Sequence, residues 1–321
     1  MSQRLLRGQP LGSASQVARM ALHAMLVLGV VVVVAMGGNL ALRAIDLNPQ
    51  PQVKAKDPAT PSGEVIARRA GGASGALVIC GGGMLPDAVR DRFFELAGGP
   101  KARIVVIPTA SPNADRPSAV RVLEIWKRRG AASVRMLHTR SPERANAADF
   151  VQPLREATGV WIGGGDQVLL SKAYVGTEVE RQLKAVLDRG GVVGGTSAGA
   201  AIMTRVMIAN GRTKAHLSQG FDFLPGAVVD QHFLRRNRME RLLGVLSSHP
   251  ELIGLGIDEQ TALVVEVREH HLSVIGNSYV VACVPDKENR HPRFQFLKPG
   301  DQTDLVLLKA PTVTAVAAQD L

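Results

Sequence analysis

Cysteine and aromatic residues are both scarce in this chain of 321 residues. Its two cysteines, Cys80 and Cys283, are too few for a disulfide framework or a cysteine-rich zinc site. Both lie in apolar runs, so we expect two buried, unreactive thiols. Aromatic side chains make up only 4% of the residues, and no stripe of Lys and Arg is interleaved with them. This composition excludes an aromatic platform for stacking bases, and nucleic acid is not an expected partner.

The charges are unevenly placed along the chain. The whole sequence carries a net charge of +10, with 38 Lys and Arg against 28 Asp and Glu. The first 70 residues hold 8 of these cations and 3 of these acids, which is half of the excess. The rest of the chain is only mildly basic, and its 45% hydrophobic content is that of a folded protein. A basic N-terminal flank suits a membrane surface.

The N-terminal region divides into three segments by composition. These are a basic flank at 1–19, an apolar membrane segment at 20–44 and a proline-rich linker at 45–63. About 20 apolar residues span a bilayer, and cations before the segment favour a cytoplasmic N-terminus. The segment is either a secretory signal cleaved near residues 41–44 or an uncleaved anchor. Its length favours the anchor, because signal peptides usually carry ~7–15 apolar residues. Both interpretations export the domain at 64–321 to a periplasmic or extracellular face.

From residue 64 onwards, apolar strands alternate with glycine turns and helices. We expect strands at 76–80, 103–107, 133–137, 158–162 and 190–194, and helices at 86–98, 117–129 and 177–189. Nearly continuous apolar strands are buried on both faces, which is typical of a parallel sheet covered by helices. The sequence therefore predicts an α/β fold with a mostly parallel, doubly wound sheet.

The C-terminal part has a different pattern. Short apolar runs at 261–267, 271–275, 279–283 and 304–308 are separated by short turns. Such spacing predicts an antiparallel extension at one edge of the sheet.

The most informative motif is GGTSAGA at 194–200, directly after an expected strand. It contains G-x-S-x-G, in which a sharp strand-to-helix turn exposes a serine hydroxyl at the carboxyl edge of a sheet. We expect Ser197 to be a nucleophile, with the N–H of Ala198 donating to an oxyanion. The competing interpretation is a structural turn or a phosphate-binding loop.

A second glycine-rich loop, GGGDQ at 163–167, follows the strand at 158–162. The amides of Gly164 and Gly165 are expected to complete the oxyanion hole, and Gln167 to orient substrate amides. Asp166 either serves the site or only caps the following helix. A third loop, Gly81–Gly83, is interpreted mainly as a turn at the rim of the site.

The third motif is DQHFLRRNRMER at 230–241. His232 ends an apolar run and is expected to be the general base for Ser197. The charged residues that follow either clamp substrate carboxylates or form a solvated helix face. Helical spacing does not allow Arg236 and Arg238 to point the same way, so we expect the helix to begin after Asn237 and Arg236 to lie in a loop.

Four motifs in order carry a family resemblance. GGGDQ at 163–167, GGTSAGA at 194–200, DQHFLRRNRMERLL at 230–243 and GIDEQTALVV at 256–265 together resemble the cyanophycinases. These belong to a serine peptidase family that also contains aspartyl dipeptidase (peptidase E), with a class I glutamine amidotransferase-like fold. The resemblance covers about residues 74–310.

The resemblance implies a substrate and a set of site residues. Cyanophycin is polyaspartate with arginine on each side-chain carboxyl, and the family cuts its backbone to dipeptides without a metal or organic cofactor. Ser197 would be the nucleophile and His232 the base. The substrate contacts would be Gln167, Asp230, Gln231, Arg236, Arg238 and Arg241.

The acid that orients His232 is less clear from the sequence. The resemblance implies a glutamate shortly after the nucleophile, but residues 204–221 contain no Asp or Glu. The candidates are Asp222 and Glu259, and a backbone carbonyl or a water is the alternative. We therefore expect an exported serine peptidase acting on aspartyl-arginine or isoaspartyl peptides. An aspartyl dipeptidase of the same family and a non-catalytic binding member are the alternatives. The sequence also allows a homodimer.

Overall fold

The computed structural model describes residues 75–286, 292–305 and 308. The expected basic flank, membrane segment and linker lie outside these residues. Among the residues that the structure describes, no helix combines the length and the apolar composition that crossing a membrane requires. The domain boundary at residue 64 therefore stays a prediction.

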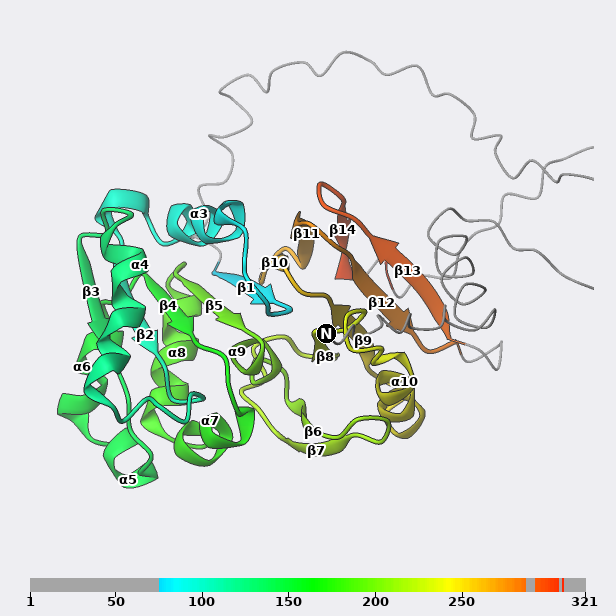
Figure 1. Cartoon of the computed structure of the whole chain (residues 1–321), viewed down its shortest axis with the longest axis horizontal. Coiled ribbons are helices and arrows are strands. Elements are labelled where there is room, and N and C mark those ends of the chain that lie inside the picture. The colour runs from blue at the N-terminus through cyan, green and yellow to red at the C-terminus, as the bar shows by residue number, and fades with distance from the viewer. Residues whose placement is uncertain (1–74, 287–291, 306–307, 309–321) are drawn as a thin grey trace, which may run out of the picture. The chain divides into compact units, whose positions relative to one another are not determined.

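Five parallel strands form one side of an eight-stranded sheet, from β1 to the edge strand β3 (Figure 1). Their spatial order is β1 (Ala76–Cys80), β5 (Val192–Thr196), β4 (Gly159–Ile162), β2 (Arg103–Ile107) and β3 (Ser133–Met136). Each pairs in parallel with its neighbour, as the two-sided apolar pattern predicted. β5 begins two residues later than expected, because Gly190, with φ of 90°, forms the preceding turn.

Helices pack on both faces of this sheet, as expected for a doubly wound fold. One face is covered by α3 (Asp87–Leu96), the 3₁₀ helix η2 (Pro117–Leu123) and α4 (Glu124–Lys127), whose Phe93 and Trp126 pack against Val78 and Trp161. The other face carries α5 (Pro142–Ala145), α6 (Ala148–Glu156), α7 (Gln167–Tyr174) and α8 (Glu178–Asp188). The helix expected at 117–129 is thus mostly 3₁₀, and it buries only Leu123 and Trp126. A short 3₁₀ helix, η1 (Gly99–Lys101), precedes β2.

An antiparallel extension continues the sheet beyond β1. β10 (Thr261–Glu266) pairs antiparallel with β1, and β11 (His271–Gly276) and β14 (Gln302–Asp304) follow. The predicted edge extension is therefore confirmed in part. The strand expected at 304–308 is wrong, because β14 ends at Asp304 and Leu305 is helical.

The strand expected at 279–283 belongs to a different sheet. β12 (Val280–Val284) lies in a four-stranded sheet with β13 (Arg293–Leu297), β9 (Ile253–Ile257) and β8 (Ala227–Gln231). β8 and β9 are parallel, and β12 and β13 are antiparallel to their neighbours. Every residue of β12 is buried, so its apolar pattern alone does not identify its partners.

Three smaller elements complete the environment of the site. Helix α9 (Ala198–Ala201) follows β5 directly, and α10 (Met239–Ser248) follows β8 after a loop. The hairpin of β6 (Val206–Asn210) and β7 (His216–Gln219) lies beside them (Figure 1). The turns that follow β1, β4, β5 and β8 lie close together at the carboxyl ends of these strands.

Candidate active site

Ser197 occupies a strained backbone position at the junction of β5 and α9. Its φ is 53° and its ψ is −108°, a conformation that a non-glycine residue rarely adopts. Its N–H donates to the Cys80 carbonyl at 3.0 Å, which fixes the turn against the end of β1. Strain of this kind is retained where surrounding structure imposes it, and it is common at catalytic positions.

The glycines of the motif allow this turn to form. A Cβ at Gly195 would overlap the Gly199 carbonyl, and a Cβ at Gly199 would overlap the Ile162 carbonyl at the end of β4. Neither glycine has a positive φ, so the constraint is space and not backbone angle. Small residues are therefore required because strand, turn and helix come into direct backbone contact.

His232 and Glu259 continue from the serine in a hydrogen-bonded chain. Ser197 Oγ lies 2.8 Å from His232 Nε2, and His232 Nδ1 lies 2.6 Å from Glu259 Oε1. His232 follows β8 directly, has a φ of 51°, and donates its N–H to the Gly81 carbonyl at 2.7 Å. A hydroxyl, an imidazole and a carboxylate in this order constitute an activated nucleophile with its base and orienting group.

Of the two candidate acids, the structure brings only Glu259 to His232. Asp222 instead accepts from the Arg205 guanidinium at 2.9 and 2.5 Å, so it was the wrong candidate. Glu259 lies between β9 and β10, 27 residues after His232 in sequence. The only sequence signal for it was its place in the motif GIDEQTALVV.

The Gly81–Gly83 loop has a larger role than that of a rim turn. A Cβ at Gly82 would lie 2.6 Å from His232 Nε2, and a Cβ at Gly83 would lie 3.0 Å from Glu259 Oε2. Both glycines have positive φ, at 108° and 71°. The loop therefore packs against both partners of the serine, and this contact was missed in the sequence.

The surroundings of His232 favour the neutral imidazole. Burial lowers the pKa of His232, whereas the hydrogen bond that His232 donates to Glu259 raises this pKa. The positive charge of Arg236 lowers the pKa further. The net shift is downward, so the imidazole is unprotonated at neutral pH, as a general base must be.

Three backbone amides expected to form the oxyanion hole have no hydrogen-bond acceptor among the described residues. These are the N–H groups of Ala198, Gly164 and Gly165. A Cβ at Gly164 would lie 3.4 Å from the Ser197 Cβ, so this loop adjoins the hydroxyl. The third loop glycine, Gly165, has φ of 139°, and a Cβ there would overlap the Ala110 carbonyl, so only glycine fits this position. This arrangement can stabilise an oxyanion.

Asp166 and Gln167 both have structural partners. The Asp166 side chain accepts from the Val168 N–H at 2.9 Å, which makes it the N-cap of α7. The Gln167 amide nitrogen donates to the carbonyls of Ile208 and Ala209 at 2.7 and 2.6 Å. Gln167 therefore anchors β6, and only its carbonyl oxygen remains for a ligand.

Asp230 and Arg241 form a buried ion pair beneath the site. The Asp230 side chain is fully buried and the Arg241 side chain is 3% exposed. Arg241 donates to both carboxylate oxygens, from Nε at 2.9 Å and from Nη2, and its Nη1 donates to the Gly211 carbonyl at 2.6 Å. Burial raises the pKa of Asp230, and the two arginines beside it oppose that shift. Asp230 therefore positions arginines and is not among the residues that line the cavity beside Ser197.

Arg238 is held in the same network. Its Nη1 donates to the Gln231 carbonyl at 2.6 Å and to Gln231 Oε1 at 2.8 Å, and it lies 3.4 Å from Asp230 Oδ1. Burial and the nearby Arg241 lower the pKa of Arg238 to about 10, so it stays charged at neutral pH. Helix α10 begins at Met239 and leaves Arg236 in the loop, as predicted.

A cavity of about 260 Å³ lies beside Ser197. Its lining contains Gln167, Gln231, Arg236, Arg238 and Arg241, five of the six expected substrate contacts, together with Asp166 and Gly165. Within the described ranges, no group of three or more His, Cys, Asp or Glu side chains is placed to hold a metal ion. Cys80 and Cys283 are buried free thiols, and burial raises the pKa of both.

Comparison with known proteins assigns the family. The model of peptidase family S51 matches residues 77–273, which is more than half of the chain. The chain belongs to peptidase family S51. This S51 peptidase is 36% identical to a cyanophycinase of Geminocystis herdmanii over 202 residues, covering 60% of this chain and 73% of that protein. It is also 36% identical to a cyanophycinase of a Nostoc species over 226 residues, covering 65% and 74%.

The fold agrees with this assignment. The crystal structure of a peptidase from an acI-B1 actinobacterium matches with a TM-score of 0.55 and 25% identity, covering 73% of this chain and 98% of that one. The S51 peptidase described here is thus a cyanophycinase-like serine peptidase.

Proposed function

We propose that this peptidase hydrolyses peptides built of aspartyl-arginine units, of which cyanophycin is the example, through an acyl-enzyme. One observation carries the proposal. The hydrogen-bonded chain of Ser197, His232 and Glu259 opens onto a cavity lined by three arginines. The similarity to two cyanophycinases supports the same substrate class.

The cavity suits both charges of such a unit. A β-aspartyl-arginine unit carries a carboxylate and a guanidinium. Arg236 and Arg238 offer charged donors to the carboxylate. Asp166, exposed at the edge of the same cavity, offers the single carboxylate of the lining to the guanidinium.

The reaction begins with proton transfer from the serine. His232 Nε2 takes the proton of Ser197 Oγ as the oxygen attacks the scissile carbonyl carbon. The amides of Ala198 and Gly164 hold the oxygen that becomes negative. His232 then gives the proton to the leaving amine, and the C–N bond breaks to leave an ester on Ser197. Water activated by His232 hydrolyses this ester.

Glu259 has an orienting role in this scheme. Its carboxylate accepts from His232 Nδ1–H, which leaves Nε2 as the proton acceptor facing Ser197. The same carboxylate stabilises the imidazolium that forms transiently.

The test is incubation of the purified full-length chain with cyanophycin and, separately, with short aspartyl and isoaspartyl peptides. Products are identified by mass spectrometry, with the Ser197→Ala chain as the control. We expect release of β-aspartyl-arginine dipeptides from the polymer, dependent on Ser197. Cleavage confined to short aspartyl peptides would instead identify an aspartyl dipeptidase of the same family. Absence of cleavage of every substrate would contradict the proposal.

A further inference from the structure

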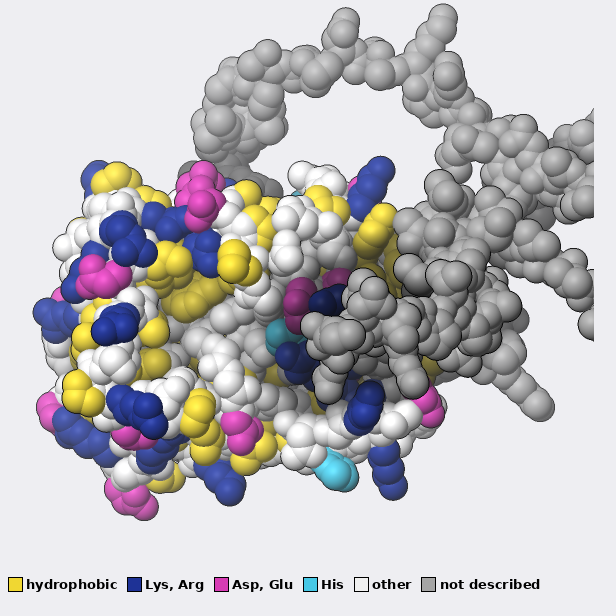
Figure 2. Space-filling view, viewed as in Figure 1, with side chains coloured by type: hydrophobic (Ala, Val, Ile, Leu, Met, Phe, Trp, Pro, Cys, Tyr) yellow, Lys and Arg dark blue, Asp and Glu magenta, His cyan; other side chains and the backbone are white. Residues whose placement is uncertain are grey.

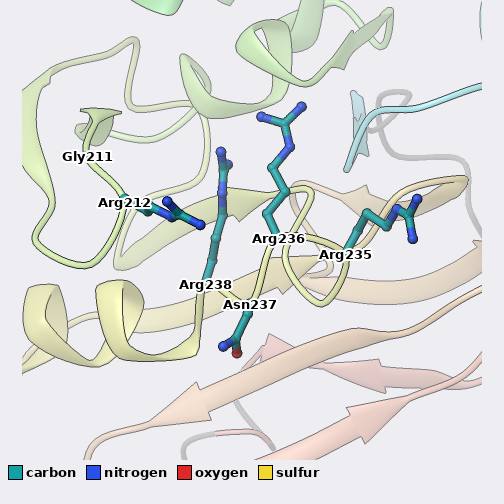
Figure 3. Close-up of a pocket in the computed structure, with 6 residues that line it drawn as sticks. All are labelled: Gly211, Arg212, Arg235, Arg236, Asn237 and Arg238. Atoms are coloured by element: carbon teal, nitrogen blue, oxygen red, sulfur yellow. The ribbon is translucent and has the colours of Figure 1, made fainter. Parts of the chain in front are cut away.

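A second, larger cavity adjoins the one beside Ser197. Its volume is about 620 Å³, within the range of ligand-binding pockets. The lining consists of Gly211, Arg212, Arg235, Arg236, Asn237 and Arg238 (Figure 3). Gly211, Arg236 and Arg238 line both cavities, so the two cavities lie side by side. A peptide with its scissile bond at Ser197 can therefore extend from one into the other.

All the charged residues that line this second cavity are cations. The lining contains four arginines and no acid. Among the described residues, the guanidinium groups of Arg212, Arg235 and Arg236 form no hydrogen bond or ion pair. The nearby carboxylate of Asp230 is buried and already held by Arg238 and Arg241. Figure 2 shows several dark blue side chains, with magenta ones among them, around the cyan side chain near the middle of this face. Gathered like charges repel one another, so the cavity is complementary to an anion.

Two segments distant in sequence build the cavity. Arg212 lies in the turn between β6 and β7, and its side chain points towards Arg238 (Figure 3). Arg236 extends from the loop after β8 and lies between Arg238 and Arg235 in this view. The Arg235 side chain points away from Arg212 and Arg238. The turn is anchored because the Gly211 carbonyl accepts from the buried Arg241 at 2.6 Å. Arg212 is thus presented from a fixed position towards Arg238.

We infer that Arg212, together with Arg236 and Arg238, forms a second subsite that binds a carboxylate on the residue adjoining the scissile one. This inference rests on the proposed function, because it extends the substrate that the Ser197 cavity holds. The preferred substrates are peptides with carboxylates on consecutive units. The same carboxylate chemistry is offered by the aspartyl side chains of an acidic peptide and by the arginine α-carboxylates of an aspartyl-arginine polymer.

Equilibrium binding to the full-length Ser197→Ala chain tests the subsite without requiring turnover. The probes are fluorescein-labelled tetra-aspartate and a labelled peptide of two β-aspartyl-arginine units, followed by fluorescence anisotropy. In this background, Arg212→Gln is compared with Lys214→Gln. Lys214 is exposed in the same turn but lines a different cavity, so it is a matched control for removing one charge.

We expect Arg212→Gln to weaken binding of at least one probe about three- to tenfold, as an exposed charge-assisted contact would. Lys214→Gln should change binding less than about twofold, and the Arg212-dependent difference should shrink at high salt. The probe that responds identifies the source of the carboxylate. Equal effects of both substitutions, or no effect of Arg212→Gln on either probe, would overturn the subsite. Failure of the proposed function would be recognised by a different result. The parent chain, with Ser197 intact, would then cleave no peptide, whatever the outcome of the binding measurements.

Discussion

Ser197 combines a strained backbone with few structural bonds from its side chain. Its hydroxyl contacts His232 Nε2 at 2.8 Å, and α9 has no side-chain cap from this residue. The fold therefore holds the position through backbone hydrogen bonds and glycine packing, and the hydroxyl is left for chemistry.

The first prediction follows from this separation of roles. Ser197→Ala should lower peptide hydrolysis by on the order of 10⁴–10⁶-fold. The free energy of unfolding should change by no more than about 1 kcal/mol, because alanine replaces only the hydroxyl. Activity is measured by product mass and stability by urea unfolding. Unchanged turnover in a pure Ser197→Ala sample would refute the serine mechanism.

His232 is subject to opposing influences on its pKa. Burial lowers the pKa, the hydrogen bond donated to Glu259 raises it, and the charge of Arg236 lowers it. Only the neutral imidazole accepts the serine proton, so activity should be lost as the pH falls through the pKa of His232. That loss is expected below about pH 6.5, the ordinary histidine value.

The second prediction concerns the acid limb of the pH profile, where activity is lost as the pH falls. Two substitutions should shift this limb in opposite directions. Glu259→Gln removes the interaction that raises the pKa, so the limb should move to lower pH. It should also reduce kcat by about 10²–10⁴-fold, because the imidazole loses its orientation. Arg236→Gln removes a cation that lowers the pKa, so the limb should move to higher pH. The measurement is kcat/KM against pH, with Asp222→Asn as a control that leaves the profile unchanged. Shifts in the same direction would contradict the assignment.

At the scale of elements, the junction of β5 with α9 depends on close backbone approach. Gly199 lies in α9 against the Ile162 carbonyl of β4, whereas Gly244 in α10 has open space around it. Both are helical glycines without positive φ, so they differ only in their packing.

The third prediction compares alanine at these two positions. Gly199→Ala should destabilise the fold by about 1–3 kcal/mol through overpacking and should displace Ser197, with loss of activity. Gly244→Ala should stabilise the fold by about 0.5–1 kcal/mol, because it removes backbone entropy from a helix. Unfolding by denaturant, followed by circular dichroism, gives both values. Similar effects of the two substitutions would show that space at the junction is not limiting.

The loop between β8 and α10 presents arginines in two different ways. Arg238 and Arg241 are fixed by Asp230 and Gln231, whereas the Arg236 side chain is exposed and its guanidinium has no partner among the described residues. Arg236 is therefore the cation of this loop that is most available to a substrate.

The fourth prediction concerns this available cation. Arg236→Gln should raise KM for aspartyl substrates and lower kcat/KM by about tenfold, the loss expected for one charge-assisted contact. A neutral ester should be affected less. Arg128→Gln, on an exposed site remote from the cavity, is the control for loss of one positive charge. Equal kinetics of Arg236→Gln and the parent chain on every substrate would leave this residue as a solvated surface charge.

At the scale of the whole molecule, we propose that residues 20–44 hold the protein in a membrane and that the peptidase domain is exported. The support is the apolar segment after a basic flank and the proline-rich linker that follows it. These residues lie outside the part of the chain that the structure describes.

The fifth prediction tests this topology. A reporter that is active only after export, fused after residue 63, should show activity. A reporter active only in the cytoplasm, fused at the same point, should not. Replacing Val31 and Val33 by Arg in the apolar segment should abolish export, because charges at the centre of a membrane segment are costly. The reverse pattern of reporter activity would refute export.

The sequence by itself determined the features that depend on local backbone chemistry. Continuous apolar runs identified β1 and β2 at their observed bounds, since both faces of a central parallel strand are buried. The small residues around Ser197 identified the strand-to-helix turn, because few other residue types fit there. Helical geometry placed the start of α10 after Asn237.

Only the tertiary structure decided which distant groups meet. Glu259 reaches His232 because β9 lies beside β8, and this pairing joins segments separated by more than 20 residues. The same packing makes Asp230 the partner of Arg241, and it separates β12 from the main sheet. A carboxylate can accept hydrogen bonds from any arginine or histidine, and the backbone of an apolar strand can pair with any neighbouring strand. Their partners are set by how the sheets pack, which one-dimensional periodicity does not encode.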